Sequence, residues 1–191
     1  TDGLPKTSKK IELIDGATIR LAGDSGDGMQ LFGTQLTNTS ALAGNDVATF
    51  PDFPAEIRAP RGTQAGVSGF QVQFASKDIF TPGDRLNALV AMNPAALVTN
   101  IADLDPGGIL IVNSESFEKK DLNLANLDAS PLDDESLGEK FRLIEVPITS
   151  LTRKAVEELG LSTKESDRCR NFFAMGLVYW LYGRELSATL R

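Results

Sequence analysis

The sequence predicts an α/β protein, a three-layer α/β/α sandwich around a mostly parallel sheet. Two observations carry this prediction. Short apolar runs alternate along the chain with stretches of helical periodicity, which is typical of parallel strands joined by crossover helices. A glycine-rich turn over residues 23–28 also joins the first apolar run to the first helical stretch, and open α/β sheets build ligand sites at such turns.

Six apolar or alternating runs predict the strands, over residues 17–23, 46–50, 67–75, 86–92, 109–112 and 141–146. The third run differs from the others, because apolar side chains alternate there with polar ones. This alternation predicts a half-exposed strand that runs antiparallel to its neighbours. It is the one expected exception in an otherwise parallel sheet.

Four stretches predict helices, over residues 28–43, 94–104, 150–159 and 166–182. The periodicity is clearest in the first stretch, where Met29, Phe32 and Leu36 share one stripe before a glycine-asparagine stop. The last helix is apolar nearly all round from residue 172, so we expect it to be buried on several sides. Residues 116–141 are polar with little pattern and predict a surface excursion.

Composition excludes several classes of function. The chain has 191 residues, which fits one domain, and its net charge of −7 disfavours nucleic acid as a partner. No apolar run approaches the ~20 residues that span a bilayer, and residues 1–10 lack the apolar core of a secretory signal, so we expect a cytoplasmic protein and no membrane partner. There is no histidine and one cysteine, Cys169, which we interpret as inert packing. The sequence therefore predicts neither a catalytic residue nor a metal site in this chain.

The glycine-rich turn consists of Gly23, Asp24, Ser25, Gly26, Asp27 and Gly28. It lacks the third glycine of a dinucleotide fingerprint and the lysine of a nucleotide P-loop. It also lacks the downstream asparagine of the Gly-Asp-Gly motif that holds magnesium in thiamine-diphosphate enzymes. A structural interpretation remains open, in which Asp27 or Ser25 caps the helix and the glycines permit a tight turn.

A second candidate site lies in the stretch of residues 51–62, whose three prolines rule out a regular helix and a central strand. We call this stretch the proline loop. It carries Glu56, Arg58 and Arg61, and the two arginines are suited to binding phosphate or carboxylate groups through their planar forks. In the alternative interpretation, Glu56 pairs with one of the arginines and only shapes the loop.

Three segments together resemble a known family. They are residues 19–33, residues 54–71 and the stretch Asn171-Phe172-Phe173-Ala174-Met175-Gly176-Leu177. These segments are similar to the gamma-type domain of 2-oxoacid:ferredoxin oxidoreductases, most of all to the N-terminal part of the alpha subunit of the 2-oxoglutarate type. The resemblance covers residues 17–186, with residues 1–16 expected as a flexible lead-in and residues 187–191 as a linker start or cut end.

The resemblance implies an enzyme complex that interconverts 2-oxoglutarate plus coenzyme A with succinyl-coenzyme A, carbon dioxide and reduced ferredoxin. Such complexes carry thiamine diphosphate, magnesium and a [4Fe-4S] cluster outside this domain, so this chain alone should bind none of them and be inactive. The expected partners are a thiamine-diphosphate-binding beta subunit, the remainder of the alpha chain and ferredoxin.

Within such a complex, the resemblance gives this domain a role in coenzyme A access and in holding the other domains together. We expect the glycine-rich turn and the proline loop to face one coenzyme A pocket. Two alternatives stay open: a purely structural assembly domain without ligand contact, and a free-standing dinucleotide-binding domain.

Overall fold

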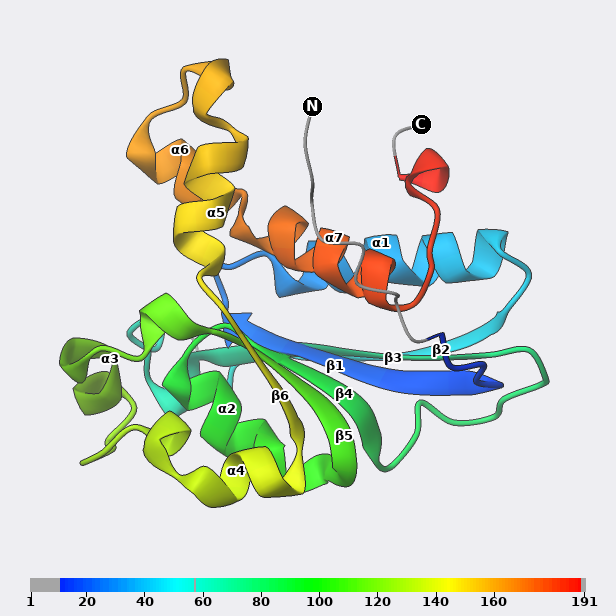
Figure 1. The fold of residues 1–191 in the computed structure, drawn as a ribbon, viewed down its shortest axis with the longest axis horizontal. Helices are drawn as coiled ribbons and strands as arrows, with labels where there is room; N and C mark the ends of the chain where they lie inside the picture. Colours follow the sequence, from blue (N-terminus) through cyan, green and yellow to red (C-terminus); the bar gives the residue numbers. More distant parts are fainter. Residues whose placement is uncertain (1–10, 57, 190–191) are drawn as a thin grey trace.

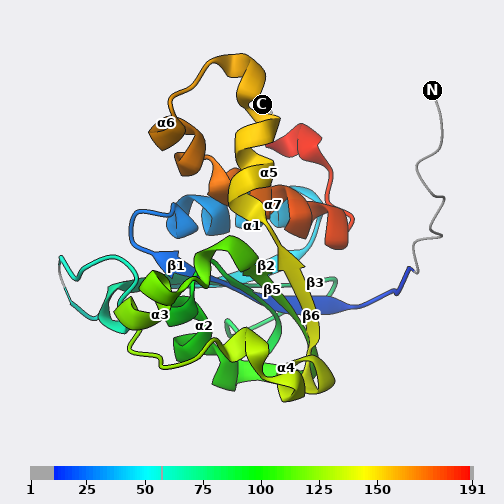
Figure 2. The ribbon, with the colours of Figure 1, turned by 60° about the vertical axis from the view of Figure 1, so that its left-hand side comes forward.

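The computed structural model describes residues 11–56 and 58–189, and shows a sheet between two layers of helices (Figures 1 and 2). The strands are β1 (Gly16–Asp24), β2 (Asp46–Asp52), β3 (Val67–Ala75), β4 (Leu86–Ala91), β5 (Leu104–Asn113) and β6 (Arg142–Val146). The helices are α1 (Met29–Leu42), α2 (Pro94–Asn100), α3 (Lys119–Leu124), α4 (Glu135–Lys140), α5 (Ile148–Ala155), α6 (Thr163–Arg168) and α7 (Arg170–Leu181). The three-layer α/β/α architecture is confirmed.

The sheet order is β2-β3-β1-β4-β5-β6. Strand β3 runs antiparallel to both of its neighbours, with Val72 opposite Ile19 of β1 and Thr49 of β2. The pairs β1–β4, β4–β5 and β5–β6 are parallel. The prediction of one antiparallel strand in a mostly parallel sheet is therefore confirmed.

The prediction that residues 67–75 are half-exposed is wrong, because both faces of β3 are covered and only Gln73 is partly exposed. Two of its polar side chains, Ser68 and Gln71, are buried and form hydrogen bonds. Gln71 accepts from Nη2 of Arg20 at 2.7 Å and donates to the carbonyl of Gly83 at 2.6 Å. Alternation of polar and apolar residues can therefore mark a buried polar network as well as a solvated face.

Two hydrophobic clusters hold the layers together. One lies between the sheet and helices α1 and α7, and includes Leu21, Phe32 and Tyr179. The other lies on the opposite face of the sheet, against α2 and the segment that contains α3 and α4, and includes Leu97 and Phe141. The predicted surface excursion over residues 116–141 thus contributes to this second cluster, since its hydrophobic side chains pack against the sheet.

The predicted helix over residues 166–182 is two helices in the structure. Helix α6 ends at Arg168 and α7 begins at Arg170, with Cys169 at the junction. Burial on several sides is borne out in part. Helix α7 packs against α1, α5 and the cluster above the sheet through Met175, Val178 and Tyr179. Its remaining side is open, since Phe172 is 47% exposed and Trp180 is 64% exposed.

Several boundaries differ by a few residues. Strand β2 continues through Pro51, which is tolerated because β2 is an edge strand. The helix predicted over residues 94–104 ends at Asn100, and the strand predicted over residues 109–112 begins at Leu104. Helix α5 ends at Ala155, before a short 3-10 turn. The expected lead-in falls mostly on residues 1–10, which lie outside the described residues, as do Leu190 and Arg191.

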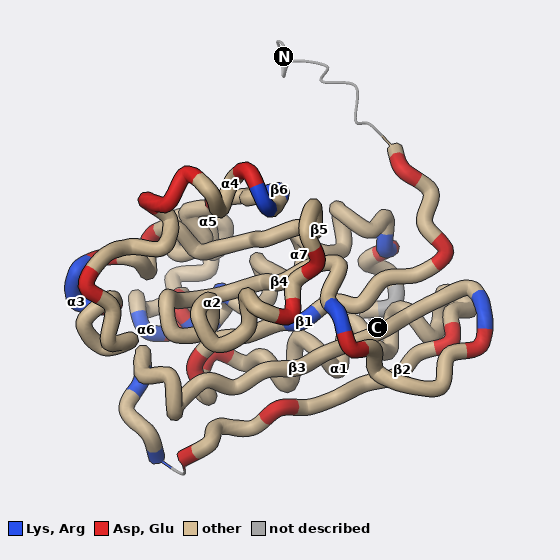
Figure 3. Tube along the Cα trace, turned by 90° about the horizontal axis from the view of Figure 1, so that it is seen from below, with Lys and Arg blue, Asp and Glu red and all other residues tan. Residues whose placement is uncertain are grey.

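The charged residues are dispersed over the fold. Figure 3 shows acidic and basic positions scattered along the whole described trace, without a single basic face. Among the described helices, none combines the length and the apolar character needed to cross a bilayer.

Candidate functional site

The glycine-rich turn lies at the carboxyl end of β1, where the chain changes direction across the sheet. After β1, the chain passes through α1 to β2 on one side of β1, whereas β4 pairs with β1 on the other side. The two following helices, α1 and α2, cover opposite faces of the sheet (Figure 1). A crevice outside the carboxyl ends of strands at such a switch point is where open α/β sheets bind ligands.

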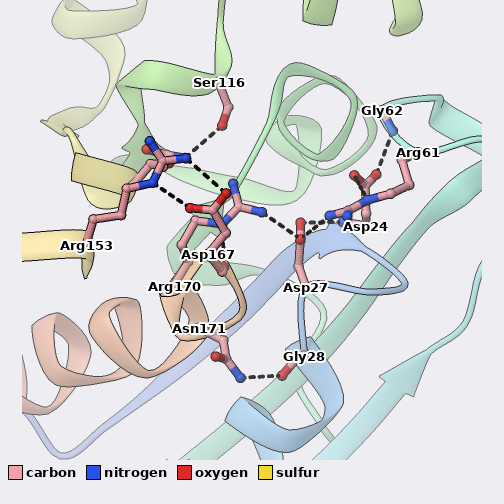
Figure 4. Close-up of polar contacts among 12 residues, drawn as sticks. Asp24, Asp27, Gly28, Arg61, Gly62, Ser116, Arg153, Asp167, Arg170 and Asn171 are labelled. Carbon is pink, nitrogen blue, oxygen red and sulfur yellow. Dashed lines mark hydrogen bonds and ion pairs between the residues drawn. The ribbon is translucent and has the colours of Figure 1, made fainter. Parts of the chain in front are cut away.

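Neither Ser25 nor Asp27 caps α1, so the capping interpretation of the turn is wrong. Gly28 occupies the N-cap position with φ 75°, and no side chain caps the helix. The Gly28 carbonyl accepts a hydrogen bond from Nδ2 of Asn171, at 3.5 Å. The side chain of Asp27 is turned toward two arginines instead (Figure 4).

The turn and the proline loop are joined through two aspartates. Oδ1 of Asp27 lies 2.7 Å from Nη2 of Arg61 and 3.2 Å from Nη2 of Arg170. Oδ1 of Asp24 accepts from the backbone N–H of Gly62 at 2.8 Å, and its Oδ2 lies 3.4 Å from Nε of Arg61. Figure 4 shows these side chains converging from β1, the proline loop and α7. We call Asp24, Asp27, Arg61 and Arg170 the ionic cluster.

Burial dominates the electrostatics of Asp27, whose side chain is only 7% exposed. Desolvation raises the pKa of this carboxyl above its ordinary value, and the negative charge of Asp24 acts in the same direction. Arg170 and Arg61 oppose the shift without cancelling it. Gly23 lets the carboxyl lie this close to the strand, since a Cβ there would come within 3.1 Å of Oδ2 of Asp27.

Two cavities flank the turn. The first, of about 240 Å³, is lined by the ionic cluster together with Gly62, Met92, Asn93, Ser116, Asp121 and Leu124. The second, of about 270 Å³, is lined by Ser25, Phe53, Pro54, Glu56, Arg58, Ala59 and Gly66. Of the predicted site residues, Asp24, Asp27 and Arg61 line the first cavity, and Ser25, Glu56 and Arg58 line the second. The glycines Gly23, Gly26 and Gly28 line neither. Gly26 lies nearer the first, since a Cβ there would come within 4.0 Å of Cζ of Arg61.

The alternative interpretation of the proline loop, an ion pair between Glu56 and one of its arginines, does not hold among residues 11–56 and 58–189. Arg61 pairs with the two aspartates of the turn rather than with Glu56. Arg58 has φ 66°, a left-handed backbone conformation that is uncommon for a residue with a side chain. Its guanidinium has no acidic partner in the described part of the chain.

The sequence did not indicate Arg170 as a site residue. Arg170 stands 143 positions from Asp27, and no local pattern connects the two. Asn171 was quoted only for the family resemblance, and Asp121 not at all. The one sequence signal that could have indicated such a partner is the pair of carboxylates in the turn, because a carboxylate that becomes buried needs a cation.

Comparison with known proteins identifies the family. Residues 18–190 match the family described as "Pyruvate ferredoxin/flavodoxin oxidoreductase". The chain belongs to this family. Its curated relatives include the 2-oxoglutarate oxidoreductase subunit KorA of Mycobacterium tuberculosis, with 53% identity over 174 residues. The match covers 91% of this chain and 26% of KorA, so the chain spans about a quarter of the length of that relative.

Solved structures of the family share the fold. The 2-oxoglutarate:ferredoxin oxidoreductase of Magnetococcus marinus, solved with 2-oxoglutarate, coenzyme A and succinyl-CoA bound, is 26% identical with a TM-score of 0.65. That match covers 87% of this chain and 24% of the other. The gamma subunit of a keto/oxoacid ferredoxin oxidoreductase from Geobacter sulfurreducens matches in fold, at 20% identity and a TM-score of 0.60, over 90% of this chain and 81% of its own. The family resemblance stated from the sequence is confirmed by the match over residues 18–190 and by the identity to KorA, and the solved structures confirm the fold.

Proposed function

We propose that the chain acts as a gamma-type domain of a 2-oxoacid:ferredoxin oxidoreductase of the 2-oxoglutarate type. In that role it takes part in the coenzyme A-dependent oxidative decarboxylation of 2-oxoglutarate, or in the reverse carboxylation. The identity to KorA supports the choice of 2-oxoacid. The Magnetococcus marinus enzyme, whose structure holds coenzyme A and succinyl-CoA, supports the choice of the second substrate.

The observation that carries the proposed site is the meeting of the two loops at the switch point of the sheet. The second cavity combines the exposed ring of Phe53 with the guanidinium of Arg58. An aromatic face suits stacking with a base, and an arginine fork suits a phosphate. Coenzyme A offers both groups, and we assign its contact to this cavity.

The metal and thiamine diphosphate of such an enzyme do not fit the Gly-Asp-Gly turn of this chain. Asp27 accepts from two guanidiniums, and its Oδ2 accepts from the backbone N–H of Asp24 at 3.1 Å. A carboxylate that is surrounded by N–H donors is not available to bind magnesium. We therefore place thiamine diphosphate, magnesium and the [4Fe-4S] cluster on other parts of the complex.

The proposed partners follow from that division. They are a thiamine-diphosphate-binding beta subunit, the remainder of an alpha chain and ferredoxin, in the cytoplasm. A domain that supplies only part of a substrate pocket acts inside an assembly, so we expect this chain to be inactive by itself.

The test substitutes Arg58 and Arg61 together by alanine in the complete enzyme. The proposal predicts a higher KM for coenzyme A in the assembled enzyme, with a much smaller change in the KM for 2-oxoglutarate. Arg85→Ala is the control, because Arg85 pairs with Asp105 at the opposite end of the parallel strands. An unchanged KM for coenzyme A would contradict the proposed contact.

A purely structural assembly domain is the second candidate, favoured by the exposed Phe172 and Trp180 on α7. In that case the double substitution lowers the yield of assembled enzyme, while the enzyme that does assemble uses coenzyme A normally. A free-standing dinucleotide-binding domain is the third candidate, and titration with nicotinamide and flavin dinucleotides tests it directly.

A further inference from the structure

We propose that Asp27 is a positioning residue, whose carboxylate holds Arg61 and Arg170 together and thereby fixes the proline loop beside the coenzyme A cavity. This inference rests on the proposed function. Asp27 touches no ligand in this account. It acts through the two guanidiniums and through the loop that one of them belongs to.

The contacts leave Asp27 little freedom. Its Oδ1 receives a guanidinium from the proline loop, 2.7 Å away, and another from the first turn of α7, 3.2 Å away. Its Oδ2 accepts from the backbone of β1 at 3.1 Å. Three segments that are distant in the sequence therefore meet on one carboxylate (Figure 4).

Backbone hydrogen bonds in short turns couple the position of Arg61 to the preceding part of the proline loop. The N–H of Gly62 is held by Asp24, and the N–H of Thr63 bonds to the carbonyl of Pro60. The N–H of Ala59 bonds to the carbonyl of Glu56, so the segment that carries Arg58 is itself a closed turn. A shift of Arg61 away from Asp27 would move this turn, and with it the wall of the second cavity.

Charge argues against a phosphate site at the ionic cluster itself. Asp24, Asp27 and Asp121 bring three carboxyl groups to the first cavity, against the two guanidiniums of Arg61 and Arg170. A phosphate there would face like charges, and both arginines are already engaged. The two arginines of the first cavity are therefore fixed by their ion pairs with aspartates and are not free to bind a phosphate. Arg58 is the arginine of the two loops that remains available to a ligand.

A charged carboxylate at this place lowers the stability of the fold. A purely structural role, in which Asp27 only stabilises the fold, therefore does not account for its charge, whereas a positioning role does. Burial disfavours the charged form of Asp27, as its raised pKa reflects. Asparagine keeps the shape of the side chain and one acceptor oxygen without the charge. Asp27→Asn should therefore fold, while holding the two guanidiniums more weakly.

The experiment compares Asp27→Asn with the unchanged complete enzyme. We expect the KM for coenzyme A to rise by about fivefold, the size of an ordinary coupling between neighbouring groups, with little change in the KM for 2-oxoglutarate. We also expect faster amide hydrogen exchange over residues 58–66, since Arg61 no longer anchors the loop. Asp105→Asn removes an exposed ion pair at the other end of the sheet and should alter neither quantity.

An unchanged KM for coenzyme A together with unchanged exchange over residues 58–66 would overturn the inference. If Asp27→Asn fails to assemble, Arg61→Gln replaces it, because this variant removes the other partner of the same ion pair. We again expect a higher KM for coenzyme A and faster amide exchange over residues 58–66. A combination of Asp27→Asn with Arg58→Ala should raise the KM by less than the product of the single effects, because both act through Arg58. If the effects of the two substitutions on the KM for coenzyme A multiply, the two residues act independently and the positioning role is wrong.

The proposed function can fail separately. If Arg58→Ala leaves coenzyme A use unchanged, the coenzyme A contact is wrong, and the exchange measurement alone decides whether Asp27 holds the loop. If Arg58→Ala raises the KM for coenzyme A but Asp27→Asn changes neither the KM nor the exchange, the contact stands and the positioning role is wrong.

Discussion

Arg61 and Asp27 stand 34 positions apart in the sequence, yet Nη2 of Arg61 lies 2.7 Å from Oδ1 of Asp27. This ion pair closes the proline loop onto the turn that follows β1. An exposed arginine paired with a buried carboxylate differs from an ordinary surface pair, because only one of the two groups is well solvated: the side chain of Arg61 is 64% exposed and that of Asp27 is 7% exposed. The relationship predicts how the fold responds to pH.

We expect Asp27 to make the fold less stable as the pH rises. Its folded pKa is raised by burial, so the folded chain binds this proton more tightly than the unfolded chain does. Asp27 therefore supports the fold most below its unfolded pKa, and this contribution is lost as pH rises through the folded pKa. Arg170, Arg61 and Asp24 are the charged groups that face it.

The measurement is the free energy of unfolding of the chain and of Asp27→Asn, from about pH 3.5 to 7, where carboxyl groups titrate. The free energy of unfolding of Asp27→Asn, relative to that of the unchanged chain, should increase as the pH rises through the raised pKa of Asp27 and then become constant. A difference that shrinks with rising pH would mean that the pKa of Asp27 is lowered, contrary to this account.

Gly33→Ala should loosen α1 from the sheet. A Cβ at residue 33 would lie 2.2 Å from the ring of Phe70, which is buried in β3. We expect a loss of about 1–3 kcal/mol in the free energy of unfolding, as for other overpacked cores. Gly176→Ala in α7 is the matched control, since a Cβ there meets nothing within 4 Å and alanine favours the helix. Equal effects of the two substitutions would exclude the packing explanation.

Gly28→Ala should cost more stability than Gly44→Ala. Both glycines have positive φ, 75° and 85°, so both substitutions carry the strain of a left-handed backbone. Only at Gly28 would the Cβ collide with a side chain, 2.4 Å from Nδ2 of Asn171. We expect a difference of about 1–2 kcal/mol between the two variants by chemical denaturation. A larger loss at Gly44 would contradict the role given to Asn171.

Gln71→Leu should destabilise the fold by about 2 kcal/mol, because it removes the acceptor of two Arg20 N–H groups and the donor to two half-buried carbonyls. Gln71 accepts from Arg20 and donates to the carbonyls of Pro82 and Gly83. Gln73→Leu is the control, since Oε1 of Gln73 is buried without a hydrogen bond among the described residues. The melting temperatures of the two variants measure the difference in stability loss. Equal losses would show that the loss depends on the removal of a polar side chain as such and not on the hydrogen-bond network of Gln71.

Periodicity predicted most of the fold correctly. The stripe of Met29, Phe32 and Leu36 placed α1 to within a residue, because one face of this helix packs on the sheet. The junction at Cys169 was missed, since no glycine or proline marks it and both flanking segments favour helix. Exposure was the weaker prediction, because the polar residues of β3 are buried by partners that local sequence does not reveal.

The candidate site was predicted in part. The sequence placed the turn after the first strand and the proline loop after the second, and predicted that the two face one pocket. The structure brings Arg61 to Asp24 and Asp27. It did not predict that Arg58 and Arg61 line different cavities. Arg170 could not be predicted, because its contact with Asp27 depends on how α7 packs across the end of the sheet.

The most direct test of the central claim is to isolate the assembly that contains this chain from its source, and to measure ferredoxin reduction. We predict that the chain co-purifies with partners carrying thiamine diphosphate and an iron–sulfur cluster, and that this assembly reduces ferredoxin only when both 2-oxoglutarate and coenzyme A are supplied. An intact assembly whose ferredoxin reduction needs neither substrate, or a chain that purifies without partners or cofactors, would contradict it.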